Sequence, residues 1–86
     1  SNFERLIKVR PNFIKIDWIF IRNILTSEES RTIIRSIKSI ADVIWAKTIA
    51  EFVESQEIQD EIVKFWIDYS QWYLFSVPND TTEIKT

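Results

Sequence analysis

The sequence predicts an α/β fold in which three parallel strands alternate with helices in the order β-α-β-α-β. Three short apolar runs, at residues 13–17, 47–54 and 67–71, are separated by two segments with apolar residues at helical spacing. The connections are too long for hairpins, so the strands should be parallel and their crossovers right-handed. This order is typical of an arc of a closed barrel or of a piece of an open doubly wound sheet, and periodicity does not choose between them.

The first part of the chain is expected to hold a helix end, a strand and a short helical stretch. Apolar residues within 3–9 have helical spacing, and Pro11 ends that stretch. Residues 13–17 form a compact apolar run with one lysine, which indicates a buried strand. Residues 18–25 return to helical spacing.

A long helix is expected next, starting at the sequence Thr26-Ser27-Glu28-Glu29. This pattern is typical of a capping box, with Thr26 as the N-cap and Glu29 reaching back to it. One apolar stripe follows at three- and four-residue spacing and should face the core. It consists of Ile33, Ile34, Ile37, Ile40, Ala41 and Ile44.

The second half of the chain repeats the strand and helix pattern. Residues 47–52 are expected to form a strand, Ser55 to cap a second helix, and residues 67–70 to form a third strand. The predicted buried face of the second helix consists of Ile58, Ile62, Val63 and Trp66. Residues 1–78 are therefore expected to form one folded unit, and the polar stretch 79–86 a loop or frayed tail.

Composition excludes several kinds of chemistry. The chain has 86 residues, a net charge of −2, no cysteine and no histidine. Disulfides, Cys/His zinc sites and Ser-His or Cys-His nucleophiles are excluded, and no cationic surface favours a nucleic acid polymer or a membrane as a partner. Because a membrane span and a signal peptide pattern are both missing from the sequence, we expect a cytoplasmic protein.

Ionisable and amide side chains lie within or at the end of each apolar run, and Lys15, Glu51, Glu54 and Gln71 are among them. In a parallel barrel the C-terminal ends of the strands carry the functional groups, so a functional site is expected at this edge. Each also has a simpler interpretation: the lysine amine extends to solvent, the glutamates are solvated loop residues, and the glutamine satisfies backbone groups.

Several stretches of the chain match one known family in order and spacing. They are Ser1-Asn2-Phe3-Glu4-Arg5-Leu6, residues 13–17, Lys47-Thr48-Ile49-Ala50-Glu51-Phe52-Val53-Glu54, residues 67–71, and Tyr73-Leu74-Phe75-Ser76 with Pro78. The chain resembles the C-terminal part of the EAL domain, a bacterial phosphodiesterase barrel that hydrolyses cyclic di-GMP. The resemblance implies a partial TIM-type barrel in which the three strands are the sixth, seventh and eighth.

The resemblance also implies roles for the candidate residues. Lys15 matches a lysine that holds and polarises the attacking water, and Glu51 a carboxylate that binds one of two Mg²⁺ or Mn²⁺ ions. Glu54 matches a carboxylate that supports the active-site loop, and Gln71 an amide near the substrate. The implied reaction is two-metal hydrolysis of cyclic di-GMP to the linear dinucleotide.

Most of the family's metal ligands, including the Glu-Ala-Leu signature, would precede Ser1 in the family's order. We therefore expect the isolated chain to be inactive and to bind no metal ion. The family's common lysine before the last proline is Val77 here. The alternative hypothesis is a non-catalytic or engineered barrel fragment that forms a homo-oligomer through exposed strand edges.

The chain contains no glycine, although about 7% is usual. All four tryptophans, Trp18, Trp45, Trp66 and Trp72, lie where members of the resembled family commonly carry glycine. A helix end often needs a positive φ angle, which is unfavourable for a bulky residue. We hypothesise systematic replacement of glycine, by redesign or by a different reading of one codon.

Overall fold

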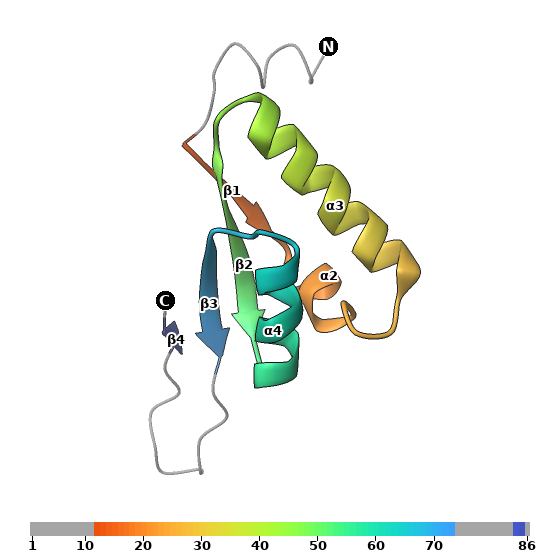
Figure 1. Cartoon of the computed structure of the whole chain (residues 1–86). Helices are drawn as coiled ribbons and strands as arrows, with labels where there is room; N and C mark the ends of the chain where they lie inside the picture. Colours follow the sequence, from red (N-terminus) through yellow and green to blue (C-terminus); the bar gives the residue numbers. More distant parts are fainter. Residues whose placement is uncertain (1–11, 74–83, 86) are drawn as a thin grey trace.

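The structure, a computed structural model, describes residues 12–73 and 84–85. Its elements are β1 (Phe13–Ile16), α2 (Trp18–Arg22), α3 (Glu28–Val43), β2 (Lys47–Val53), α4 (Gln56–Lys64), β3 (Tyr69–Tyr73) and β4 (Ile84–Lys85). Strands β1, β2 and β3 run in the same direction with helices between them, which confirms the predicted α/β fold (Figure 1). Within the described residues, no helix is long and apolar enough to cross a membrane.

The sheet has the strand order β1-β2-β3-β4. Its three parallel strands are in register such that Lys15 lies beside Ile49, and Ile49 beside Tyr69. The fourth strand was not expected, because the sequence predicts a loop over 79–86. Its two residues, Ile84 and Lys85, pair antiparallel with the C-terminal end of β3.

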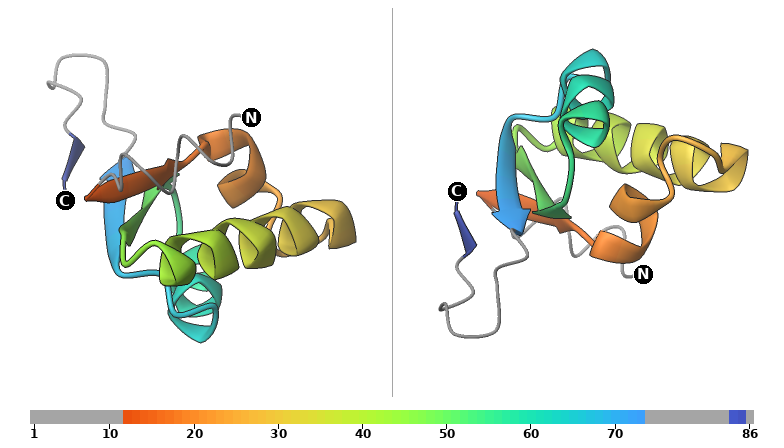
Figure 2. Two further views of the ribbon diagram at one scale, coloured as in Figure 1. Left: turned by 90° about the horizontal axis from the view of Figure 1, so that it is seen from above. Right: turned by 90° about the horizontal axis from the view of Figure 1, so that it is seen from below.

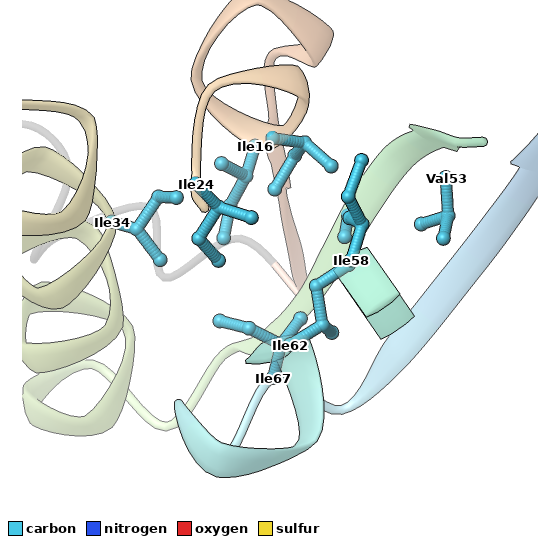
Figure 3. Close-up of a cluster of buried hydrophobic side chains, with 9 residues drawn as sticks. Ile16, Ile24, Ile34, Val53, Ile58, Ile62 and Ile67 are labelled. Atoms are coloured by element: carbon cyan, nitrogen blue, oxygen red, sulfur yellow. The ribbon is translucent and has the colours of Figure 1, made fainter. Parts of the chain in front are cut away.

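One face of the sheet carries the main hydrophobic core. Helices α3 and α4 lie on this side, which we call the helix face (Figure 2). Isoleucines dominate the core (Figure 3). Strand β1 contributes Ile16 to it, and β2 contributes Ala50 and Val53. The buried cluster consists of Ile16, Ile21, Ile24, Ile34, Ala50, Val53, Ile58, Ile62 and Ile67.

The opposite side of the sheet, which we call the open face, is defined by residues in the other phase of the alternation. They are Phe13 and Lys15 of β1, Ile49 and Glu51 of β2, and Tyr69 and Gln71 of β3. None of these six residues is fully buried. Three of the candidate site residues, Lys15, Glu51 and Gln71, therefore lie on the open face.

Side-chain oxygens cap the three helices in the described part of the chain. The predicted N-cap of α3, Thr26, is wrong by one residue: Ser27 is the N-cap, and its Oγ accepts a hydrogen bond from the Ser30 amide at 3.1 Å. A capping box needs an acidic or amide side chain three residues after the cap, and Ser30 occupies that position. Ser55 caps α4 as predicted, and Asp17 caps α2.

The C-terminus of α3 forms a Schellman motif around Trp45. The Trp45 N–H donates to the Asp42 carbonyl at 3.3 Å, and the Ala46 N–H donates to the Ala41 carbonyl at 2.9 Å. Helix α4 ends in the same way at Trp66. The φ angles of the two tryptophans are 64° and 63°, in the left-handed region where such a motif usually places glycine.

The buried face of α4 is narrower than predicted. Ile58 and Ile62 are buried, but Val63 is 60% exposed and Trp66 is 80% exposed, so the prediction that these two face the core is wrong. Trp66 lies beyond the last helical turn, and its left-handed backbone turns the side chain away from the core. The next residue, Ile67, enters the core in its place.

Candidate functional site

Strand β1 places Lys15 on the open face. Its neighbour Ile16 is fully buried in the core, and Ile14 packs against a smaller buried cluster near the end of α3. Because successive side chains of a strand point to opposite faces, Lys15 must point away from both clusters, and it is exposed. The structure thus puts this cationic side chain on the solvent-accessible side of the sheet.

A β-bulge separates the two halves of the β2–β3 pairing. Ala50 lies opposite Ser70, and the next aligned pair is Val53 with Trp72. Three residue steps on β2 therefore match two on β3, so Glu51 and Phe52 together lie opposite Gln71. This irregularity occurs at the C-terminal end of the parallel sheet, where the candidate residues were predicted.

The structure brings Lys15, Glu51 and Gln71 to neighbouring positions of the open face. Lys15 is level with Ile49, two residues before Glu51 on the adjacent strand. Standard strand spacings put the Cα atoms of Lys15 and Glu51 roughly 8 Å apart, within reach of two long side chains. Glu51 and Gln71 are half-buried. Glu54 follows the last residue of β2 and is exposed, so it lies at the rim of this group.

Two aromatic residues that sequence reasoning did not select adjoin this group. Phe52 has a φ angle of 54°, and its ring contacts the ring of Tyr73 on β3, with centroids 5.5 Å apart and planes at 68°.

The sequence contains one signal of the bulge. Ala50 and Val53 are both apolar core residues but are three positions apart, which breaks the two-residue period of a regular strand.

At the opposite end of the sheet, Thr48 and Asp68 donate hydrogen bonds to each other. Partial burial raises the pKa of Asp68, but hydrogen bonds from the Thr48 amide and hydroxyl, with the charges of Lys38 and Lys47, outweigh it and leave this pKa below its usual value. Asp68 lies before β3, at the N-terminal end of the strands. Its role is therefore structural, and it lies away from the candidate site.

The oxygen donors of the open face supply only a share of a divalent metal site. Glu51 and Gln71 offer carboxylate and amide oxygens, which are ligands that Mg²⁺ and Mn²⁺ accept. In the part of the chain that the structure describes, no three acidic side chains gather in a way that could hold a metal ion. An octahedral ion needs about six ligands, so these residues alone do not fit a complete site.

A hollow of about 370 Å³ lies between α3 and α4. Arg31 lies in it, donating to Glu61 at 3.4 Å and to the Ile24 carbonyl at 3.1 Å. The guanidinium groups of Arg31 and Arg35 also lie over the ring of Phe65. These contacts hold the two helices together, so the hollow has a structural explanation.

Known proteins with similar sequences include bacterial proteins named as cyclic di-GMP phosphodiesterases. The chain is 47% identical over 73 residues to cyclic di-GMP phosphodiesterase PdeA of Borreliella burgdorferi, covering 84% of this chain and 11% of that protein. It is 36% identical over 78 residues to cyclic di-GMP phosphodiesterase PdeF of Escherichia coli K12, covering 91% of this chain and 10% of that protein. The chain thus spans about a tenth of the length of these relatives.

A solved structure has the same fold over most of the chain. It is PaMucR phosphodiesterase in a c-di-GMP complex, with a TM-score of 0.72 and 22% sequence identity, covering 78% of this chain and 27% of that one. The family profile of the EAL domain matches residues 1–78. The stretches that resemble this family lie within that match, and the chain therefore belongs to the EAL domain family.

Proposed function

We propose that this chain is the C-terminal arc, strands six to eight, of a cytoplasmic EAL phosphodiesterase that hydrolyses cyclic di-GMP to the linear dinucleotide. The observation that carries the proposal is the common position of Lys15, Glu51 and Gln71 on the open face, where parallel strands end. Relatives named as cyclic di-GMP phosphodiesterases support the choice of substrate.

Each side chain has a chemical role in this proposal. The Lys15 ammonium donates hydrogen bonds to the attacking water and holds it in position, while the Gln71 amide orients the substrate. The Glu51 carboxylate would be one ligand for Mg²⁺ or Mn²⁺ in the complete barrel, and Glu54 supports the loop that follows β2. Divalent ions held there would supply Lewis acidity.

The isolated chain should not catalyse this reaction. Glu51 and Gln71 are too few ligands for two ions, and an open sheet face does not exclude water from a charged transition state. The remaining ligands would have to come from the other strands of the barrel. The proposal therefore concerns the share of the site that this chain contributes.

A chimeric barrel tests this share directly. Residues 1–78 would replace the matching C-terminal segment of E. coli PdeF, and hydrolysis of cyclic di-GMP would be measured with Mn²⁺ and with Mg²⁺. We expect a folded, active chimera and no turnover by the 86-residue chain alone. A folded chimera without activity would contradict the proposal. Turnover by the isolated chain would contradict the statement that this chain supplies only part of the active site.

One observation favours a second candidate function, self-association of the isolated chain. Phe13 and Tyr69 are each 52% exposed on the open face, and their ring centroids are 6.1 Å apart. Among the described strands, β1 lies at the edge of the sheet. Exposed strand edges and exposed aromatic side chains promote association with another chain. Light scattering with and without Mn²⁺ tests this: a metal-independent dimer or larger assembly supports the homo-oligomer, and a strict monomer contradicts it.

A further inference from the structure

The bulge in β2 depends on an unusual backbone conformation at Phe52. Its φ of 54° lies in the left-handed region, which is unfavourable for a residue with a Cβ atom. The two other described residues with positive φ, Trp45 and Trp66, end helices, whereas Phe52 lies within the sheet. It directly follows Glu51 and faces Gln71 across the bulge.

The extra residue changes which side chains share a face. In a regular strand, Glu51 and Glu54 would point to opposite faces, because they are three residues apart. The bulge shifts the alternation by one, so Val53 is fully buried in the core on the helix face. Glu54, the next residue, is then in phase with the open face, as is Glu51.

The Phe52 ring contact helps to hold this conformation. Its edge-to-face packing against Tyr73 joins the bulge of β2 to the end of β3. Val53 on the other face anchors the same segment in the core. A backbone outlier that is fixed on both faces and adjoins candidate catalytic groups is typical of strain retained for positioning.

We propose that Phe52 is a positioning residue, whose left-handed backbone creates the bulge that places Glu51 and Glu54 on the same face as Lys15 and Gln71. The purpose of this arrangement rests on the proposed phosphodiesterase function. The geometry itself does not, and it can be tested without activity or metal. Glycine at position 52 should preserve the arrangement, because it adopts positive φ freely, and alanine should not.

The absence of cysteine makes disulfide trapping a clean test in the 86-residue chain. The reporter pair is Glu51→Cys with Gln71→Cys, which face each other across the bulge. The control pair is Ile49→Cys with Tyr69→Cys, aligned outside the bulge. Each pair is combined with Phe52, Phe52→Gly or Phe52→Ala, and the disulfide formation rate is measured in a glutathione buffer.

We expect Phe52→Gly to retain the ratio of the reporter rate to the control rate, and Phe52→Ala to lower it at least fivefold. The two variants both lack the ring, so their difference isolates the backbone angle. Equal ratios in the glycine and alanine variants would overturn the proposal. So would a lower ratio with glycine than with alanine.

A second measurement decides the question if Phe52→Ala fails to fold. Nuclear Overhauser effects in the unsubstituted chain report the φ angle of Phe52 and the contacts of Glu51 with Gln71. A strong contact between the Phe52 amide proton and its own α proton, together with Glu51–Gln71 contacts, supports the proposal. A negative φ at Phe52 overturns it, and neither result depends on cyclic di-GMP hydrolysis.

Discussion

Thr48 and Asp68 join the starts of two neighbouring strands through three hydrogen bonds. The Thr48 amide donates to Asp68 Oδ2 at 2.9 Å and its hydroxyl donates to the same oxygen at 3.1 Å. In return, the Asp68 amide donates to Thr48 Oγ1 at 3.1 Å. Loss of the Thr48 hydroxyl would leave the Asp68 amide without this hydrogen-bond partner. Thr48 is itself fully buried.

The first prediction concerns pH. Folding lowers the pKa of Asp68 from its unfolded value of 3.8. The ionised carboxylate therefore stabilises the protein fully above that unfolded pKa, and this contribution is lost as the pH falls through the lower folded pKa. Thr48→Val should raise the Asp68 pKa and weaken this dependence. Carboxyl NMR titration measures the pKa of Asp68. Unfolding experiments at pH values from about 6 to about 3, the range in which Asp side chains titrate, measure the stability.

Thr48→Ser is the matched control for that prediction, because it keeps the hydroxyl. It should retain the lowered pKa of Asp68. A Thr48→Val chain whose Asp68 pKa is unchanged would show that the backbone amide bond and the neighbouring lysines suffice.

The second prediction concerns the helix ends. Trp45→Gly and Trp66→Gly should each stabilise the chain by about 1 kcal/mol, since glycine removes the cost of left-handed backbone and the side chains are 85% and 80% exposed. Thermal unfolding should show a rise of about 4–8 °C per substitution. Trp72→Gly is the control, and it should destabilise, because Trp72 packs against the core.

The same comparison bears on the hypothesis that tryptophan has replaced glycine. The left-handed angles support it at positions 45 and 66, and nothing comparable in the described residues supports it at Trp18 or Trp72. The encoding DNA and an intact mass spectrum decide the matter. Glycine codons read as glycine would exclude replacement in the protein itself.

The third prediction tests the narrower buried face of α4. Ile62→Ala should destabilise the chain by about 2–5 kcal/mol, because Ile62 is almost fully buried in the core. Val63→Ala, one residue later, should change stability by less than about 0.5 kcal/mol, because Val63 is mostly exposed. Chemical denaturation measures both. Equal effects would contradict the orientation of this helix.

The fourth prediction compares two lysines of the sheet in the active chimera, one in the candidate site and one at the start of β2. Lys15→Ala should reduce kcat roughly 100-fold or more, as expected for loss of a donor at the reacting centre. Lys47→Ala removes the same charge from the first residue of β2 and should leave kcat unchanged. Steady-state hydrolysis of cyclic di-GMP measures both. A similar loss from both variants would point to a general charge effect.

The sequence by itself determined the order of the three parallel strands and the helices between them, and part of the core. The stripe in α3 depends only on local periodicity, so Ile34 could be assigned to the interior without a structure. The resemblance to the EAL domain likewise depends on residues at fixed spacing. Local hydrogen-bonding preference also identified Ser55 as a cap, although the same reasoning missed Ser27 by one position.

Only the tertiary structure decided the register and the backbone angles. A bulge arises when two strands pair, so the position of Phe52 opposite Gln71 depends on residues about twenty positions apart. The same holds for the short strand β4 and for the pair between Thr48 and Asp68. Periodicity within one segment determines which side chains avoid water, whereas pairing between segments determines which functional groups meet.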